Sequence, residues 1–384
     1  MEKTLFFTVE EYEKRLENVR KGMREKGVDV LLVHTPENIY YMSGFQSMGY
    51  YVYGCLVIPL EKEPYWVGRH LEEFNWLRLS WMQDYDCFKD IEDPVEVTVK
   101  SLEKRGLKNK VVGLETENWF LTSSNYIRFK EMLPNAIPCN GVIEKCRLIK
   151  SPAEIGYIRE AARITEKAMT AGINAVKVGA TEDDVAAAVN YAFTKEGSEW
   201  ISMGPFVCAG ERASLAHATW EGKVIEAGTN VWFEIAGVKH RYNCALERVV
   251  FTGEKGNEEM IKLTETIMKA LYYAIGEIKP GMTASQADYT CRHIINEETG
   301  LGNFYRHRFG YSIGISFSPD WGEGHILSLR DGVQDVLQPG MVFHVPPAII
   351  GYRNLAVGCS ETIMITETGC EAITNYPRKI FIAE

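Results

Sequence analysis

The chain has 384 residues, of which 46% are hydrophobic and 24% are charged, and its formal net charge is −10. That length is too great for one ordinary domain and suits two. The acidic balance disfavours nucleic acid as a partner, because an acidic surface repels phosphate groups. No apolar run approaches the roughly 18 residues that a membrane span needs, so no membrane partner is expected.

The opening residues and the cysteines favour a cytoplasmic protein. Residues 1–27 carry acidic side chains from Glu2 onward and show helical spacing in place of an apolar signal core. The nine cysteines include no C-x-x-C pair, so neither a zinc site nor a disulfide framework is indicated. We therefore expect reduced thiols and a cytoplasmic location.

The first 146 residues predict an α/β domain. Thr8 followed by Glu11 has the spacing of a capping box at the start of an amphipathic helix over 8–27, and the short apolar run at 28–35 predicts a buried strand. Further helical and strand-like segments alternate, which indicates a sheet covered by helices. The expected strands are 53–60, 65–68 and 111–115, and the expected helices are 71–81, 95–105 and 125–132.

A different pattern begins at 147–169, where Ser151-Pro152 starts a long helix. We place the domain boundary there, which gives domains of 1–146 and 147–384. The second domain is expected to be α+β, with a curved antiparallel sheet backed by helices. Its expected helices are 153–176, 183–196, 258–278 and 283–299; its expected strands lie in 229–252, 341–345, 361–366 and 379–384; a glycine- and aromatic-rich segment covers 300–324.

Four residues stand in settings that suggest chemistry: His217, Glu234, Glu247 and Glu361. A carboxylate in an apolar strand is costly unless it is paired or hydrogen-bonded. Taken singly, Glu247 is equally well explained as a local partner of Arg248, and Glu234 as an outward-facing strand residue. Taken together with the upstream histidine, the two strand glutamates have the composition of an acid–base site.

The other histidines carry weaker signals. His240 lies in the turn of the hairpin and is expected to be solvated. His307 and His325 flank the glycine-rich segment, where pocket-lining and structural roles are equally good explanations. The rest, including His344, stand in no recognisable ligand spacing.

Segments across nearly the whole chain resemble the superfamily of creatinase, prolidase, aminopeptidase P and methionine aminopeptidase. The resemblance implies a pita-bread catalytic domain of class α+β after a creatinase-type N-terminal α/β domain. The segments are LENVRKGMREKGVDVLLVHTPENIYYMSGF (16–45), RLIKSPAEIGYIREAARI (147–164), LQPGMVFHV (337–345) and ETIMITETGCEAIT (361–374).

The metallopeptidases of this superfamily hold a pair of metal ions through Asp, His and Glu side chains. The resemblance places those ligand positions on Glu234, Ala245, Tyr311, Pro346 and Glu361. Hard divalent cations need several converging oxygen or nitrogen donors, which alanine and proline lack and a neutral tyrosine supplies poorly. We therefore expect no metal and no other cofactor.

Metal-free branches of the superfamily are similar to this chain. CALERVVF (244–251) resembles the corresponding strand of creatinase, which implies that Glu247 binds a guanidinium group and that His217 is the catalytic base. The similarity to ectoine hydrolase is more extended. Its segments are YYV (50–52), AHATW (216–220), WFEIAG (232–237), HRYNC (240–244), IGISFSPDWGE (313–323) and LSLR (327–330).

The substrate stays open between these two branches. Val52 stands where creatinase has an arginine for the carboxylate of creatine, whereas Glu247 is creatinase-like. The resemblance therefore implies a metal-independent hydrolase that cleaves a non-peptide C–N bond of a small amidine, guanidino or cyclic amide compound. Two alternatives remain: a metal-dependent Xaa-Pro dipeptidase or aminopeptidase, and a pita-bread protein that binds without catalysis.

For the metal-free reaction we expect His217 to act as general base and acid. Glu234 and Glu247 would hold the cationic C–N unit, with direct nucleophilic attack as an alternative role for Glu234. Glu361 would be a third acidic wall or would orient His217. The resemblance also implies a homodimer in which the N-terminal domain completes the neighbour's active site. The expected substrate-binding residues are Tyr50, Tyr51, Tyr311, Asp320 and Trp321.

Overall fold

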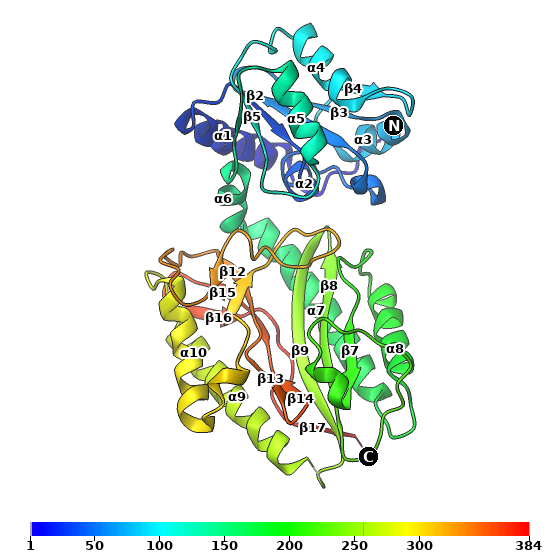
Figure 1. Cartoon of the computed structure of the whole chain (residues 1–384), viewed down its shortest axis with the longest axis vertical. Coiled ribbons are helices and arrows are strands. Elements are labelled where there is room, and N and C mark those ends of the chain that lie inside the picture. Colours follow the sequence, from blue (N-terminus) through cyan, green and yellow to red (C-terminus); the bar gives the residue numbers. More distant parts are fainter. Residues whose placement is uncertain (1, 256, 384) are drawn as a thin grey trace. The chain divides into compact units, whose positions relative to one another are not determined.

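The structure is a computed structural model that describes residues 2–255 and 257–383 (Figure 1). It consists of two compact units, Met1–Arg147 and Leu148–Glu384. The nine cysteines are free thiols. Within the described ranges, no helix combines the length and the hydropathy that crossing a bilayer requires.

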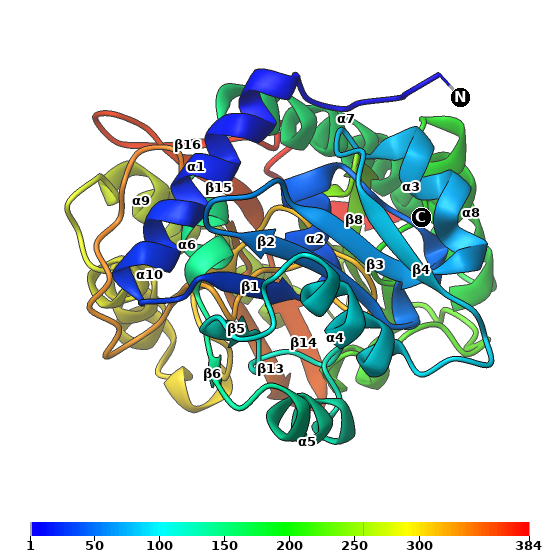
Figure 2. The ribbon, with the colours of Figure 1, turned by 90° about the horizontal axis from the view of Figure 1, so that it is seen from above.

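The N-terminal unit is built around a six-stranded sheet with the strand order β4-β3-β2-β1-β5-β6. Helices α4 and α5 pack apolar side chains against one face of this sheet, and α1 runs along the other (Figure 2). The expected alternation of strands and helices is confirmed. The strands are β1 (Val30–Val33), β2 (Gly54–Pro59), β3 (Tyr65–Arg69), β4 (Tyr85–Phe88), β5 (Val112–Leu114) and β6 (Ala136–Pro138); the helices are α1 (Val9–Glu25), α2 (Pro36–Ser43), η1 (Met48–Tyr51), η2 (His70–Glu72), α3 (Glu73–Leu79), α4 (Pro94–Lys104), α5 (Ser123–Met132) and α6 (Val142–Leu148).

Two α-helices of this unit, α6 and α2, were not expected from the sequence pattern, and the reason is clear for α2. Apart from Glu37 its residues are buried, so the alternation of polar and apolar positions that signals a helix is missing. Its end signals are local: Pro36 occupies the first turn, and Gly44 ends the helix in the left-handed conformation at φ 80°. Complete burial therefore hid a helix whose start and stop residues are present in the sequence.

The C-terminal unit contains two larger sheets, β17-β9-β8-β7 and β11-β10-β12-β15-β16, and the hairpin β13-β14. In Figure 1, α7 and α8 lie beside the first sheet, and α9 and α10 lie beside the second. The strands are β7 (Phe206–Ala209), β8 (Asn230–Lys239), β9 (Tyr242–Thr252), β10 (Gly310–Ser312), β11 (Ser328–Leu329), β12 (Val342–Val345), β13 (Ala348–Tyr352), β14 (Leu355–Gly358), β15 (Glu361–Ile365), β16 (Cys370–Ala372) and β17 (Phe381–Ala383). The helices are α7 (Pro152–Ala175), α8 (Glu182–Lys195), η3 (Gly210–Ser214), α9 (Glu258–Glu277), α10 (Ala284–Thr299) and η4 (Gly302–Phe304).

The expected helices of this unit are confirmed, and the expected single antiparallel sheet is wrong. Ser151 starts α7 with a complete capping box, as its position before Pro152 predicted. The strands divide between two sheets, and the closing strand β17 pairs parallel to β9. Because strand patterns carry no partner information, a run of short strands could not be divided into sheets from sequence alone.

The turn between β8 and β9 differs from its expected solvated state. His240 and Arg241 both adopt positive φ angles, 46° and 61°. The Nδ1 atom of His240 lies 3.1 Å from Oε1 of Glu199, and its side chain is 23% exposed. The expectation that His240 is solvated is therefore wrong, because the turn folds back against the segment that follows α8.

A buried threonine fastens α7 to the β8–β9 hairpin. The Thr165 hydroxyl accepts a hydrogen bond from the Gly237 backbone N–H at 2.8 Å and donates to the carbonyl oxygen of Cys244 at 2.8 Å. Helix and strand approach so closely that a Cβ atom at Gly237 would stand 3.1 Å from the Ala161 carbonyl oxygen. The hairpin that carries Glu234 and Glu247 is thus held in place by backbone contacts with α7.

We predict that Thr165→Val lowers the free energy of unfolding by about 1–3 kcal/mol, because the near-isosteric change leaves two buried backbone groups without this partner. Denaturant unfolding with unchanged m-value would measure it. Thr194→Val on α8 is the matched control, since Thr194 is exposed and its hydroxyl bonds within the helix; it should change the stability by no more than about 0.5 kcal/mol. Equal effects of the two substitutions would contradict the role of Thr165.

Candidate active site

Three strands bring one aromatic ring and two carboxyl groups into a single row. Glu234 of β8 stands directly opposite Glu247 of β9, and Phe206 of β7 stands opposite Glu234. Directly opposed residues project from the same face of an antiparallel sheet. That face is turned away from α7 and α8, because the alternate residues Phe233 and Ile235 belong to the core beneath those helices. We call Phe206, Glu234 and Glu247 the acidic row.

Both carboxyl groups of the acidic row are largely shielded from solvent, which rules out the solvent-facing alternative for Glu234. Its side chain is 16% exposed, and Glu247 is 1% exposed. Oε1 of Glu247 has no hydrogen-bond partner among the described residues. A Cβ atom at Gly358 of β14 would come within 2.1 Å of this oxygen, so glycine is the residue that leaves room for the carboxyl group.

Burial and mutual repulsion make both carboxyl groups weak acids. Desolvation raises the pKa of Glu234 to about 8, and the negative charge of Asp320 adds to this effect. Desolvation also raises the pKa of Glu247 well above its usual value, and here the second cause is Glu234 itself. Without a compensating cation, the row therefore holds protons at neutral pH.

A neutral histidine from the second sheet faces the acidic row. His344 of β12 is fully buried, and its Nδ1 atom lies 3.8 Å from Oε1 of Glu234. Nδ1 is hydrogen-bonded to the Tyr311 hydroxyl at 2.9 Å, and Nε2 to the Ser360 hydroxyl at 2.7 Å. Burial, followed by the charges of His307 and Arg308, lowers the pKa of His344 to about 3. Both ring nitrogens are thus engaged and the ring is uncharged.

Ligand spacing in the sequence gave His344 no role, and the structure places it at the centre of the site. A histidine inside the apolar strand MVFHV could have indicated this position, because a buried imidazole needs hydrogen-bond partners. Tyr311 stands directly opposite His344 in the ladder of β10 and β12, so the polar contact follows from strand register. Register between distant strands is not readable from one sequence.

Aromatic rings connect His217 to the second sheet. The indole Nε1–H of Trp321 donates to the Tyr311 hydroxyl at 2.7 Å. The ring of Phe206 lies 5.2 Å from the ring of Trp321 and 5.7 Å from the imidazole of His217, measured between centroids. The structure therefore places His217, Tyr311 and Trp321 around the acidic row; their roles stay predictions.

His217 itself is exposed and lies in the loop after η3. Its backbone φ angle is 61°, a left-handed conformation that costs a non-glycine residue of order 1–3 kcal/mol and persists only where the surroundings impose it. Its charge contributes to the lowered pKa of His307, after burial and Arg308. The imidazole is thus electrostatically part of the site while it keeps contact with solvent.

Of the other expected substrate-binding residues, Asp320 is exposed and close enough to influence Glu234 and Tyr311 electrostatically. Tyr50 and Tyr51 lie in η1 of the N-terminal unit, where their rings form an edge contact at 6.5 Å and Tyr51 is 76% exposed. Their contribution to a substrate pocket stays a prediction.

Glu361 takes a structural position in place of the expected substrate contact. Its carboxylate accepts hydrogen bonds from Arg248 Nη2 at 2.9 Å and from the Thr374 hydroxyl. In the ladder with β12, Thr362 stands opposite His344, whereas Glu361 stands opposite Val345. Neighbouring strand residues project to opposite faces, so Glu361 points away from the face of His344.

Ser360 is the residue of this segment that reaches the site. Its hydroxyl bonds His344 Nε2 and also accepts from the backbone N–H of Glu247 at 2.6 Å. Arg248 donates to the Ser360 carbonyl oxygen at 2.6 Å, so its side chain belongs to Ser360 and Glu361 and does not form the local ion pair considered for Glu247. The carboxyl group of Glu247 therefore still needs a positively charged partner if it is to be ionised.

Comparison with known proteins agrees with this arrangement. Residues 156–367 match metallopeptidase family M24, and residues 15–149 match the creatinase/prolidase N-terminal domain. The chain belongs to family M24. Over 402 residues it is 30% identical to a protein named ectoine hydrolase from Halomonas elongata, with 99% of both chains covered.

Relatives named for peptide hydrolysis are comparably similar to this M24 hydrolase. It is 29% identical to the Xaa-Pro dipeptidase of Pyrococcus furiosus over 95% of this chain and 99% of that one. The crystal structure of a prolidase from Pyrococcus horikoshii superimposes with a TM-score of 0.84 at 25% identity, covering 95% of this chain and 99% of that chain. The expected two-domain pita-bread fold of class α+β is confirmed.

The family name implies a metal, and the residues present do not fit one. At the positions that the resemblance assigned to ligands, Ala245 and Pro346 carry no donor atom, and the Tyr311 hydroxyl is engaged by Trp321 and His344. Over the ranges that the structure describes, no group of three or more His, Cys, Asp or Glu side chains is arranged to hold a metal ion. A dinuclear centre would lack most of its donors.

The raised pKa of Glu234 predicts a pH-dependent stability. A carboxyl group whose pKa rises from 4.5 to about 8 on folding binds more protons in the folded state, so its stabilisation is present at acidic pH and is lost as the pH rises from about 4.5 to 8. Glu234→Gln should remove this loss. We expect the variant to be more stable than the parent above pH 8, by up to a few kcal/mol at about 1.4 kcal/mol per pKa unit, and the difference to vanish near pH 4.5.

Unfolding midpoints measured across this pH range test the prediction. Glu226→Gln, at an exposed position of the loop before β8, is the matched control and should leave the pH profile of stability unchanged. A Glu234→Gln profile parallel to that of the parent would show that the folded state does not hold the proton.

Proposed function

We propose that this protein is a metal-independent hydrolase that cleaves a non-peptide C–N bond in a small amidine, guanidino or cyclic amide compound. The observation that carries the proposal is the pair of carboxyl groups of Glu234 and Glu247, which stand opposite each other, with Oε1 of Glu247 lacking a hydrogen-bond partner among the described residues. The similarity to the relative named ectoine hydrolase supports the same reaction class.

A cationic ligand meets the electrostatic demand of the acidic row. Two facing carboxylates form charge-assisted hydrogen bonds with the N–H groups of an amidinium or guanidinium ion. The unsatisfied Oε1 atom of Glu247 is an acceptor available for such a bond, next to Glu234. The rings of Tyr311 and Trp321 form an adjacent wall, on which a delocalised cation is further stabilised.

The hydrolysis needs a base and then an acid, and we assign both to His217. Its imidazole removes a proton from water as the water oxygen adds to the amidinium carbon. The tetrahedral intermediate then collapses, the C–N bond breaks, and the departing nitrogen takes the proton from the imidazolium. Water is consumed, and the hydroxyl proton of the intermediate passes to the released amine as the carbonyl forms. An amidinium ion thus gives an amide and an ammonium ion, and a guanidinium ion gives a urea and an ammonium ion, with His217 returned to its neutral state.

The remaining site residues prepare this step. His344 is uncharged and fixes the Tyr311 hydroxyl on one side and Ser360 on the other, which keeps the wall opposite the acidic row rigid. Glu361 forms an ion pair with Arg248, and the arginine charge lowers the pKa of Glu247 less than desolvation and Glu234 raise it. A direct nucleophilic attack by Glu234 is a variant of the same reaction, in which water hydrolyses the resulting acyl-type adduct.

The main alternative is a metal-dependent Xaa-Pro dipeptidase, favoured by the 29% identity to the relative of that name. The donor set argues against it, since Ala245 and Pro346 cannot coordinate a cation. We further propose a cytoplasmic location, which the opening residues and the cysteines favour. The resemblance implies a small-molecule substrate and a homodimer in which Tyr50 and Tyr51 complete the neighbouring site, and we propose both.

We predict that His217→Ala lowers kcat by about 10²–10⁴-fold, the usual contribution of a general base, while exhaustive treatment with EDTA leaves the parent enzyme fully active. Amine release from ectoine, creatine and the dipeptide Gly-Pro measures both effects and identifies the substrate class. Activity on Gly-Pro that disappears with EDTA and returns with Mn²⁺ or Co²⁺ would establish the dipeptidase alternative in its place.

The affinity for a cation should depend on pH. Because the pKa of Glu234 is about 8 in the free protein, binding of acetamidinium below that pH must displace a proton. The dissociation constant should therefore fall as the pH rises from 6 to 8, by up to about tenfold per pH unit. The groups that face Glu234 are Glu247, Asp320, Tyr311 and His344, and of these His344 is already neutral in this range.

Calorimetry in buffers of different ionisation enthalpy measures the proton release, with neutral acetamide as the matched control ligand. Glu234→Gln should bind acetamidinium more weakly and without this pH dependence. Affinity that is constant from pH 6 to 8 in the parent protein would contradict the cation-binding role of the row.

A further inference from the structure

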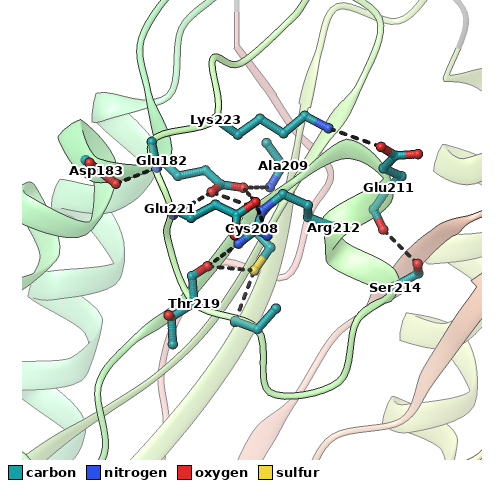
Figure 3. Close-up of polar contacts among 12 residues, drawn as sticks. Glu182, Asp183, Cys208, Ala209, Glu211, Arg212, Ser214, Thr219, Glu221 and Lys223 are labelled. Carbon is teal, nitrogen blue, oxygen red and sulfur yellow. Dashed lines mark hydrogen bonds and ion pairs between the residues drawn. The ribbon is translucent and has the colours of Figure 1, made fainter.

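His217 lies in a loop, residues 210–222, whose two arms meet at one buried carboxylate (Figure 3). We call this segment the His217 loop. Glu182, the first residue of α8, is fully buried. Its Oε1 atom accepts from the backbone N–H of Ala209 at 2.7 Å, before the loop, and its Oε2 atom accepts from the backbone N–H of Glu221 at 3.0 Å, near the loop's end.

Arg212 ties the same two arms together through its side chain. Its Nε atom donates to Oε1 of Glu182 at 3.1 Å, and its Nη1 atom lies 2.5 Å from a carboxylate oxygen of Glu221. It also donates to the carbonyl oxygen of Thr219. As Figure 3 shows, the guanidinium group lies between residues that precede His217 and residues that follow it.

Two further hydrogen bonds hold the loop. The Cys208 thiol donates to the carbonyl oxygen of Ala218 at 3.0 Å, directly after His217. Oδ1 of Asp183 accepts from the Gly222 backbone N–H at 2.8 Å. The N-terminus of α8 therefore holds the exit of the loop, while the strand β7 holds its middle.

His217 needs such support, because little holds the residue itself. Its side chain is exposed and its backbone is in the left-handed region at φ 61°. Its imidazole contacts the ring of Phe206 of the acidic row. An exposed loop residue with an unfavourable backbone conformation keeps one orientation only if the ends of its loop are fixed.

We propose that Glu182, acting through Arg212, is a positioning residue that fixes the His217 loop and thereby orients the catalytic imidazole. This inference rests on the proposed role of His217 as general base. Glu182 does not touch the acidic row in this arrangement; it acts on the proton-transfer step alone. We call the contacts of Glu182 and Arg212 with the two arms of the loop the clamp. Loss of the clamp should accordingly lower kcat and leave ligand binding by Glu234 and Glu247 intact.

The test uses Glu182→Gln, Arg212→Lys and Arg212→Ala in the full chain. The amide of glutamine places an N–H donor where the carboxylate accepts, and lysine keeps the charge of Arg212 but cannot bridge several acceptors in one plane. With whichever of ectoine, creatine and Gly-Pro the parent hydrolyses, we expect kcat to fall about 10- to 100-fold in Glu182→Gln and Arg212→Ala. KM and the acetamidinium dissociation constant should change less than about threefold, and Arg212→Lys should retain more activity than Arg212→Ala.

A second readout does not depend on turnover. Chymotrypsin should cleave the clamp variants after Leu215 or Trp220, both exposed in the His217 loop, at least about tenfold faster than the parent. Global unfolding midpoints show whether the change is local. Glu226→Gln is the control for the loss of one acidic charge near the loop, and should alter neither kcat nor the rate of cleavage.

The outcomes separate the two proposals. The clamp alone would be overturned if Glu182→Gln and Arg212→Ala fold and show full kcat and unchanged cleavage while His217→Ala loses its activity. Full kcat in His217→Ala would overturn the role of His217 and with it the positioning role. If Glu182→Gln does not fold, the pair Arg212→Lys and Arg212→Ala decides the question, because the Arg212 side chain keeps some contact with solvent, whereas Glu182 is fully buried.

Discussion

Two carboxyl groups placed opposite each other on a dry face of the β8–β9 ladder set the requirements that the rest of the C-terminal unit meets. Like charges directly opposed in a sheet are destabilising, and burial multiplies the effect. Arg248 gives only limited relief: its charge lowers the pKa of Glu247 less than desolvation and Glu234 raise it, and its side chain is engaged by Ser360 and Glu361. Protonation or a bound cation is what remains.

The hydrogen-bonded side chains opposite the acidic row are uncharged. Trp321, Tyr311, His344 and Ser360 form a chain of hydrogen bonds that ends at the backbone N–H of Glu247. Burial keeps the imidazole of His344 neutral, so the chain cannot neutralise the carboxyl groups. On the proposed function, the further positive charge that stabilises their ionised forms arrives with the ligand.

The sequence predicted the helices well, because amphipathic spacing and capping residues such as Ser151 are local signals. It did not predict how the closing strands divide into two sheets, nor α2, whose burial removes the periodic signal. The acidic row could be anticipated, since Glu234 and Glu247 interrupt an apolar hairpin whose register is set by its own turn.

The second wall of the site could not be anticipated in the same way. His344, Ser360 and Tyr311 meet through the pairing of strands far apart in the chain, and that register is tertiary information. The same reason explains the misplacement of Glu361: resemblance located the right turn, but the alternation of side chains along β15 decides that Ser360 faces His344 and that Glu361 faces Arg248.

The acidic row and His217 thus lie on elements of different rigidity. The carboxyl groups lie on paired strands fastened to α7 through Thr165, whereas the imidazole lies on a loop whose order depends on one buried carboxylate and one guanidinium group. On the proposed function, binding of the cation rests on the strands, while proton transfer depends on the precise placement of His217. Substrate affinity and the rate of the chemical step would then be controlled by separate sets of contacts.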